Sequence, residues 1–437
     1  MIRTPIQDPI PRRVLSRSIF ATSLAALAFC GASAHAAQEV SRAEYEQMKR
    51  ELAELRQEMK ALRSTASVPA PASAKSAPKG ALGQSFAEMS DTVNSLRSGE
   101  IKALVTGGAE ATFTAARNSA SNFSAVFEPL LLWHINDRLL FEGAVEFELE
   151  GSVTKTKLEY AQIDWTLNDY ITLVGGKFLN PVNNYVERYT PTWIRKLPDN
   201  PLGLYDGFLP ESNLGAQIRG VVPIGNGRIN LAAYVSNAPK LVTDDPEALG
   251  SLQFDNWNSQ ADSKAFGGRI GLMPCQNFEI GYGVQSARVR GDGTKSVSSL
   301  IQSVDLSAHT DAAKGRIALL GQYAWSKTGD FTYDADGSLG VGPLRYSNHR
   351  DGGYAQLSYR GKQWDSDLMN HLEFIVRGDV SNAPNDAPGG FDERRLTFGI
   401  DYWIASSTVL KAAYEIDHRN NNEPNGDAIL FQLSTGF

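Results

Sequence analysis

Apolar and polar residues alternate with period two along most of the chain from about residue 101 to residue 437. The segment 138–150 shows the pattern clearly, because five of its large apolar residues have odd numbers: Leu139, Phe141, Val145, Phe147 and Leu149. Its even positions carry Glu142, Glu146 and Glu148. Successive side chains of a β-strand point to opposite faces, so this pattern predicts a strand with one apolar and one charged face. The periodicity alone fits a soluble β-sandwich and a transmembrane β-barrel equally well.

Sixteen segments with this pattern can be placed along the chain. The predicted strands are 101–117, 121–135, 138–150, 155–167, 170–178, 213–222, 228–237, 264–273, 278–290, 297–308, 315–327, 350–360, 370–381, 392–404, 408–418 and 427–437. Connections after even-numbered strands are mostly short turns, whereas the long segments 179–212, 238–263 and 328–349 all follow odd-numbered strands. This alternation is typical of outer-membrane barrels, which have short periplasmic turns and longer external loops. We therefore predict an all-β fold, a transmembrane antiparallel up-and-down barrel of sixteen strands over 100–437.

Aromatic residues agree with this prediction. Trp133 and Trp165 each stand just before a predicted periplasmic turn, where the aromatic girdle of a barrel lies. The last predicted strand ends on Phe437 with an apolar residue at every second position before it. A terminal aromatic on an alternating strand is the form of the signal read by the outer-membrane assembly machinery, which is therefore a predicted partner.

The first hundred residues have a different character. Residues 1–36 combine basic residues, a short apolar run and the small-residue site Ala34-His35-Ala36, which predicts a signal peptide. Residues 37–63 carry apolar residues at alternating spacings of three and four, which predicts a periplasmic coiled-coil helix: Tyr45, Met48, Leu52, Leu55, Met59 and Leu62. The alternative is a single helix docked on a neighbouring surface. Residues 64–99, rich in Ala, Pro and Ser at their start, predict a linker and lead-in to the barrel.

Composition excludes several classes of protein. The chain has 437 residues, a formal net charge of -7 and a mean hydropathy of -0.28. It lacks the repeated apolar runs of about 18 residues that a helical membrane protein needs, and its acidic balance argues against nucleic-acid binding. The histidines are dispersed, and no HExxH, GxSxG or CxxC motif occurs. We therefore predict neither an enzyme nor a cofactor or metal site.

Four short motifs resemble the phosphate-selective porin O/P family of trimeric, sixteen-stranded outer-membrane channels. They are Gly176–Pro181 (GKFLNP), Glu187-Arg188, Trp193–Lys196 (WIRK) and Leu209–Gln217 (LPESNLGAQ). The resemblance implies a homotrimer, and a loop after the fifth strand, about 179–212, that folds into the barrel and narrows the pore. The charged residues in and beside this loop are then candidates for the narrowest point: Lys177, Glu187, Arg188, Arg195 and Lys196. The alternative is that these five form salt bridges that fix the loop to the barrel wall.

The charges of the predicted lumen depart from that family. Its phosphate-selective members line the pore with arginines and lysines, whereas here the acidic candidates are Glu142, Glu146, Glu148 and Asp164. Basic candidates are scattered on later strands, among them Arg219, Arg228, Arg269 and Arg316. Acidic residues on strands 1–4 that face basic residues on strands 6–15 would set up a transverse field across the pore.

These observations together predict the function of a porin. We expect a water-filled channel in the outer membrane of a Gram-negative bacterium, through which small polar solutes or ions diffuse passively past a charged constriction. The expected surroundings are the lipid bilayer and lipopolysaccharide. An anion- or phosphate-selective porin is the first alternative. A structural outer-membrane anchor with a periplasmic coiled coil is the second.

Overall fold

The structure is a computed structural model that describes residues 102–437, apart from 118, 206, 255–262, 292–293, 389 and 421–423. The predicted signal peptide (1–36), the coiled coil (37–63) and the linker with its lead-in (64–99) all lie outside the described residues. Within the described residues, no helix is long and apolar enough to cross a membrane.

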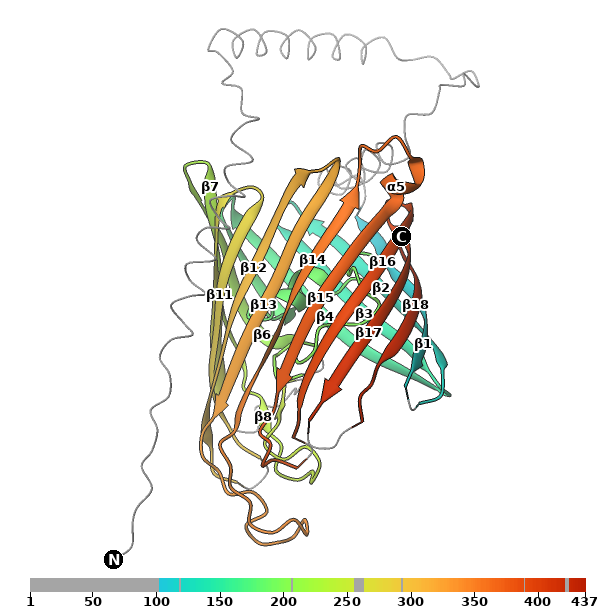
Figure 1. Cartoon of the computed structure of the whole chain (residues 1–437). Helices are drawn as coiled ribbons and strands as arrows, with labels where there is room; N and C mark the ends of the chain where they lie inside the picture. The colour runs from blue at the N-terminus through green and yellow to red at the C-terminus, as the bar shows by residue number, and fades with distance from the viewer. Residues whose placement is uncertain are drawn as a thin grey trace, which may run out of the picture. The chain divides into compact units, whose positions relative to one another are not determined.

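Sixteen antiparallel strands close into one barrel (Figure 1). The first eight in the barrel are β1 (Ala103–Ala116), β2 (Asn122–Asn136), β3 (Leu139–Glu150), β4 (Val153–Asn168), β5 (Ile171–Leu179), β6 (Ser212–Ile224), β7 (Gly227–Asn237) and β10 (Lys264–Cys275). The others are β11 (Phe278–Val289), β12 (Val297–Ala312), β13 (Gly315–Thr328), β14 (His349–Gly361), β15 (Leu372–Asn382), β16 (Asp392–Ala405), β17 (Thr408–Arg419) and β18 (Ala428–Gly436). The predicted fold class is confirmed, and the predicted strands coincide with these to within a few residues.

The barrel closes where the last strand pairs with the first. β18 runs antiparallel to β1, and the backbone of Phe437 exchanges two hydrogen bonds with Gly107, at 3.1 and 3.2 Å. The Phe437 ring packs on Phe127 of β2 with ring centroids 5.8 Å apart. Closure leaves neither β1 nor β18 as a free edge, which a barrel in lipid requires because unpaired backbone groups there are costly.

The outer face of the barrel is apolar. On β16, Leu396, Phe398 and Ile400 are exposed, whereas Thr397 and Asp401, at positions of the opposite parity, are buried. The cross-strand partners of the outer residues are again apolar, so the alternation continues from strand to strand. Trp133 and Trp165 are 50 % and 48 % exposed at the end with the short turns, where the sequence predicted them. An apolar belt flanked by aromatic side chains is the surface that suits a lipid bilayer.

The two ends of the barrel differ. The short turns lie at the upper end in Figure 1, together with the helix α5 (Asp367–His371). The start of β1 and the end of β18 lie at the same end. The described parts of the long connections 238–263 and 329–348 lie at the lower end, and the first carries the small two-stranded sheet of β8 (Lys240–Leu241) and β9 (Leu252–Gln253). Neither α5 nor this small sheet was predicted. His371 ends α5, so the strand predicted from 370 begins two residues later.

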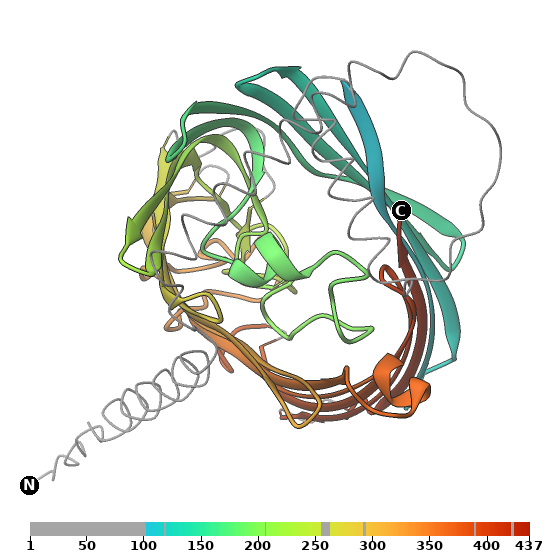
Figure 2. The same ribbon diagram turned by 90° about the horizontal axis from the view of Figure 1, so that it is seen from above.

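The connection from β5 to β6 lies inside the barrel, as the view along its axis shows (Figure 2). We call residues 180–211 the inner loop. It contains the helix α4 (Asn184–Tyr189), whose first turn is capped by the side chain of Asn183. Apolar residues of the loop pack against the barrel strands in one buried cluster, which includes Val182, Val186, Leu204, Leu209, Ile301 and Ala324. Much of the lumen is therefore filled by packed side chains.

Candidate functional site

Hydrogen bonds from buried side chains attach the start of the inner loop to the wall. The Val182 carbonyl accepts from the Ser303 hydroxyl of β12 at 2.7 Å and from the Gln322 amide of β13 at 3.1 Å. The Tyr185 backbone N–H donates to the Gln322 carbonyl oxygen at 2.9 Å. Because these partners are buried, each unmade bond would leave a polar group without compensation. The loop is therefore held in one position against β12 and β13.

Charged side chains attach the rest of the inner loop to β15–β17. The Arg377 guanidinium donates to the carbonyls of Asp199 and Asn200 at 2.8 and 3.1 Å. Arg395 forms an ion pair with the Asp199 carboxylate, and Lys196 forms one with Glu373. These strands thus hold the far side of the loop through both its backbone and its side chains.

A third attachment lies at the seam between β1 and β18. Arg195 donates two hydrogen bonds to Glu110, at 2.9 and 2.8 Å, and the two side chains are 10 % and 9 % exposed. Burial alone would lower the pKa of Arg195, but the adjacent Glu110 raises it above its ordinary value, so the guanidinium stays charged. Trp193 packs on the same seam, where a Cβ on Gly108 or Gly436 would come within 2.8 Å of its ring atoms.

The basic residues of the later strands are paired on their own side of the barrel. Arg269 binds Glu279 and Asp305 at 2.9 and 2.5 Å, and Arg377 binds Asp379 at 2.9 Å. Arg269 and Arg377 therefore do not face the acidic strands across open water, as the expected transverse field would require of them. Pairing occurs because carboxylates alternate with these bases on the same lumen face, at short range in a partly buried setting.

A cavity of about 450 Å³ remains between the inner loop and strands β1–β4. We call it the acidic cavity. Its carboxylates are Glu110, Glu128, Glu146, Glu148, Glu159 and Asp199. Its basic groups are Lys155, Lys157 and Arg195. With six carboxylates and three basic groups along its wall, the cavity carries an excess of negative charge when all are ionised.

A β-bulge on β4 shapes this charge pattern. The register with β3 shifts so that Ala144 faces Tyr160 whereas Val145 faces Leu158. The extra residue, Glu159, changes which positions face the lumen. Lys155 and Lys157 consequently point inward, where Lys155 pairs with Glu148 at 3.4 Å. Strict alternation from Trp165 would have placed both lysines on the lipid face, so the sequence analysis missed them.

Two further cavities continue from the acidic cavity toward the end with the short turns. The middle cavity, of about 130 Å³, shares Glu128, Glu159 and Thr190 with the acidic cavity. The arginine cavity, of about 510 Å³, shares Glu187 with the middle cavity and reaches the β4–β5 turn at Asp169. The three cavities therefore follow one another along one side of the inner loop, from the external ends of β1–β4 to the opposite end of the barrel.

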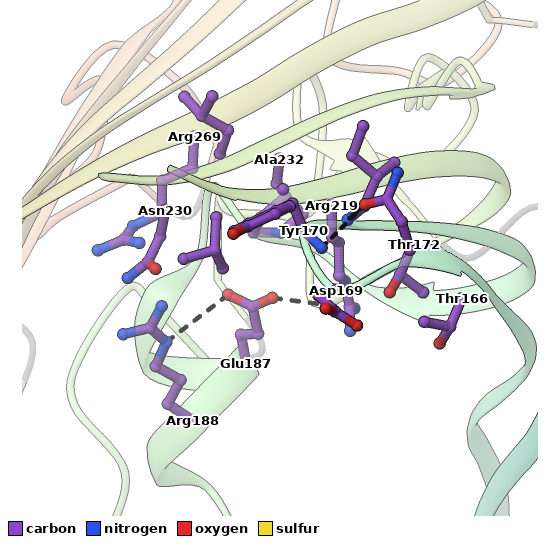
Figure 3. Close-up of a pocket in the computed structure, with 16 residues that line it drawn as sticks. Thr166, Asp169, Tyr170, Thr172, Glu187, Arg188, Arg219, Asn230, Ala232 and Arg269 are labelled. Carbon is purple, nitrogen blue, oxygen red and sulfur yellow. Dashed lines mark hydrogen bonds and ion pairs between the residues drawn. The ribbon is translucent and has the colours of Figure 1, made fainter. Parts of the chain in front are cut away.

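The arginine cavity brings together charged residues that lie far apart in the sequence (Figure 3). Glu187 of α4 lies between Arg188 and Arg219, at 4.0 and 3.9 Å. Arg188 also donates to Glu279 of β11 at 2.8 Å, and the buried Arg269 borders the cavity. All three arginines here have carboxylate partners.

The remaining candidate residues lie outside this constellation. Lys177 is buried and donates to the Leu158 carbonyl at 2.6 Å. Glu142 and Asp164 lie on the lumen face of β3 and β4, close enough to interact with Arg219 electrostatically. Arg228 contacts the Met273 sulfur at 3.1 Å, and the half-exposed Arg316 pairs with Asp311 at 3.1 Å at the end with the short turns.

No protein-family model matches the chain, and no curated protein sequence matches it. Among solved structures, a complex of OmpF from Salmonella typhi with daunomycin is similar, with a TM-score of 0.50 and 11 % sequence identity over 77 % of this chain and 97 % of that chain. The chain has the fold of a sixteen-stranded outer-membrane porin. At this identity the similarity concerns the fold alone.

Two other solved structures cover the same share of the chain. The outer membrane channel DcaP of Acinetobacter baumannii gives a TM-score of 0.48, with 9 % identity over 77 % of this chain and 97 % of that chain. An anion-selective porin from Comamonas acidovorans gives 0.47, with 10 % identity over 77 % and 99 %.

Proposed function

We propose that the protein is an outer-membrane porin through which small hydrophilic solutes and ions diffuse passively. The observation that carries this proposal is the row of three neighbouring charged cavities that follow one another between the inner loop and the barrel wall. A polar route through a barrel with an apolar outer face is the arrangement that a passive channel requires. The inner loop supplies the constriction, with Glu187, Arg188 and Arg195 on its border.

The charge of the route favours cations over anions. Glu128 and Glu146 line the acidic cavity, and within the described residues neither forms an ion pair. Unpaired fixed charge in a narrow aqueous space concentrates the opposite ion and repels the like one. The middle cavity adds Glu128, Glu159 and Glu187 without a basic group. We therefore infer a preference for cationic and neutral polar solutes.

One observation favours the anion-selective alternative. Arg188, Arg219 and Arg269 border the cavity at the end with the short turns. Each of the three lies within 4 Å of a carboxylate, so the net field that an anion would meet there is small. The phosphate selectivity implied by the sequence motifs thus has weaker support than the cation preference.

The surroundings of the channel are part of the same proposal. The apolar outer face suits the outer membrane of a Gram-negative bacterium, where lipopolysaccharide would contact the external rim. The predicted coiled coil at 37–63 would support a homotrimer on the periplasmic side. An anchor without a channel is the remaining alternative, and it gives no reason for a row of charged cavities along the barrel.

Cysteine labelling in planar bilayers tests the route directly. After the predicted signal cleavage, Cys275 is the only cysteine, so the experiment uses a Cys275→Ser background. Ser124→Cys lies on the acidic cavity, whereas Ser434→Cys is fully buried on the lumen face of β18. A cationic thiosulfonate should reduce the current of the first variant faster than an anionic one and leave the second unchanged. Equal and slow reaction of both variants, or absence of any current, would refute the proposed route.

A further inference from the structure

A separate polar cavity of about 220 Å³ lies on the other side of the inner loop, toward the external end. Gly203 and Phe208 of the inner loop and residues 250–252 of the long β7–β10 connection border it. Its wall consists of the external ends of β13, β14 and β15. The polar residues that line it are Ser251, Ser326, Thr328, Asn348, Arg350, Ser381 and Asn382. None of the residues that line this cavity is acidic.

Arg350 differs from the other lumen arginines of these strands. Arg269, Arg377 and Arg395 each have a carboxylate within 3.5 Å, whereas Arg350 has no ion pair within the described part of the chain. Arg350 interacts instead with the side chain of Tyr346, whose hydroxyl donates to the Leu249 carbonyl at 2.6 Å. The Arg350 Nε is buried and has no hydrogen-bond acceptor.

The carboxylate nearest in sequence does not neutralise Arg350. Asp351 follows it on β14 and therefore points to the opposite, outer face of the strand. There Asp351 accepts hydrogen bonds from Tyr323 at 2.5 Å and from Asn382 at 2.7 Å. A partly buried guanidinium without an anionic partner is costly, because it has lost water and gained no opposite charge. The site is therefore electrostatically incomplete.

Two hydroxyl groups beside Arg350 also lack partners. Ser326 and Thr328 of β13 are 4 % and 5 % exposed and border the cavity. Neither hydroxyl makes a hydrogen bond to another described residue. Ser326 is the direct cross-strand neighbour of Arg350 in the register of β13 and β14. A guanidinium and two hydroxyls thus offer donors to one small space.

We propose that this cavity binds a small oxyanion, a carboxylate or a phosphate group. A planar guanidinium and adjacent hydroxyls match the acceptor geometry of both groups, and such charge-assisted bonds are the strong ones. The volume of about 220 Å³ admits a small organic acid or inorganic phosphate but not a drug-sized ligand. The inference rests on this cavity alone and does not require that the barrel conducts.

Isothermal titration calorimetry on the full chain in detergent tests the proposal, with acetate, succinate and inorganic phosphate as probes at constant ionic strength. Arg350→Gln removes the charge and keeps the size of the side chain. The control is Arg360→Gln, because Arg360 stacks on Trp403 at 4.1 Å and does not border the cavity. We expect at least one probe to bind saturably, Arg350→Gln to weaken that binding by about tenfold or more, and Arg360→Gln to leave it unchanged.

A second variant tests the site even if Arg350→Gln does not fold. Ser326→Ala with Thr328→Val removes both hydroxyls, keeps the charge and should weaken binding several-fold, with heat-modifiable gel mobility as the check on the barrel. Tighter binding of inorganic phosphate than of succinate would assign the site to phosphate, and the reverse order would assign it to carboxylates. Flat titrations with all three probes, or equal losses in the Arg350 and Arg360 variants, would overturn the proposal. Failure here leaves the channel itself untouched, because conduction is measured separately.

Discussion

The two sides of the lumen use the same residue types in opposite ways. On β10–β17, acidic and basic side chains pair with one another and with the inner loop, as Arg269 does with Asp305 and Arg395 with Asp199. On β2 and β3, Glu128 and Glu146 border the acidic cavity without an ion pair in the described chain. Charge on the first side stabilises the position of the loop, and charge on the second side faces the solute. The number of charged residues therefore says less about selectivity than which of them are paired.

The largest effect should come from breaking the attachment at the β1 seam. Arg195→Ala leaves the buried Glu110 without its partner, and loss of one member of a buried pair costs about 3–5 kcal/mol. Urea unfolding of the variant measures this loss. The double variant Glu110→Gln with Arg195→Gln removes both charges and should recover part of the stability. Equal stability of the single variant and the unmodified protein would mean that the seam does not hold the loop.

The next effect concerns the side of the lumen where Glu128 and Glu146 border the acidic cavity. Glu128→Gln with Glu146→Gln removes two unpaired carboxylates from the route and should shift the ratio of potassium to chloride permeability several-fold toward unity. Reversal potentials in a potassium chloride gradient give this ratio. The matched control is Arg419→Gln with Asp417→Asn on β17, which removes an ion pair at 3.0 Å from the opposite side of the lumen without changing its net charge. If the control shifted the ratio as much, the distinction between the two sides would be wrong.

A smaller effect should follow from removing an uncharged side chain that attaches the inner loop to β13. Gln322→Ala removes the hydrogen bonds to the Val182 carbonyl and the Tyr185 N–H, which should lower stability by about 1–3 kcal/mol and increase current noise from a looser loop. Gln302→Ala serves as the control, since Gln302 accepts only an exposed hydrogen bond from Tyr282 on the outer face. Chemical unfolding and single-channel recording report the two effects, and a quiet channel in the Gln322 variant would contradict the role of this residue.

The smallest effect is expected outside the lumen. Lys240 donates to Asp244 at 3.1 Å in an external connection, and this hydrogen bond lowers the pKa of the carboxyl group. Its contribution to stability is present above the unfolded-state pKa and is lost as the pH falls through the lowered folded-state value. Asp244→Asn should remove that pH dependence. The change in stability should be less than about 0.5 kcal/mol, because the Asp244 carboxylate is exposed. Unfolding at pH 7 and at pH 3 measures it, and a larger change would show that this connection supports the barrel.

The sequence was sufficient to predict the barrel because its strands are regular. Alternation and the lengths of the connections located all sixteen strands, and the orientation of Trp133 and Trp165 followed from the same pattern. The pattern failed on β4, where the bulge at Glu159 reverses the parity and turns Lys155 and Lys157 inward. A bulge depends on pairing with a neighbouring strand, which local periodicity does not contain.

The candidate site was harder to predict than the fold. The inward position of the inner loop agrees with what the motif resemblance implied, but the partners of its charges depend on strands far away in sequence. Glu110 lies 85 residues from Arg195, and Glu373 lies 177 residues from Lys196. Such pairs follow from closure of the barrel around the loop. The sequence was sufficient to identify the charged residues of the inner loop. The structure was needed to distinguish those that attach the loop to the barrel wall from those that border the cavities.

The reversal potential of the unmodified protein in a planar bilayer, under a tenfold gradient of potassium chloride, tests the central claim most directly. A route lined by the unpaired Glu128 and Glu146 predicts a stable current whose reversal potential has the sign of cation preference. A reversal potential of the opposite sign, or a bilayer that stays silent after insertion of the barrel, would contradict the account.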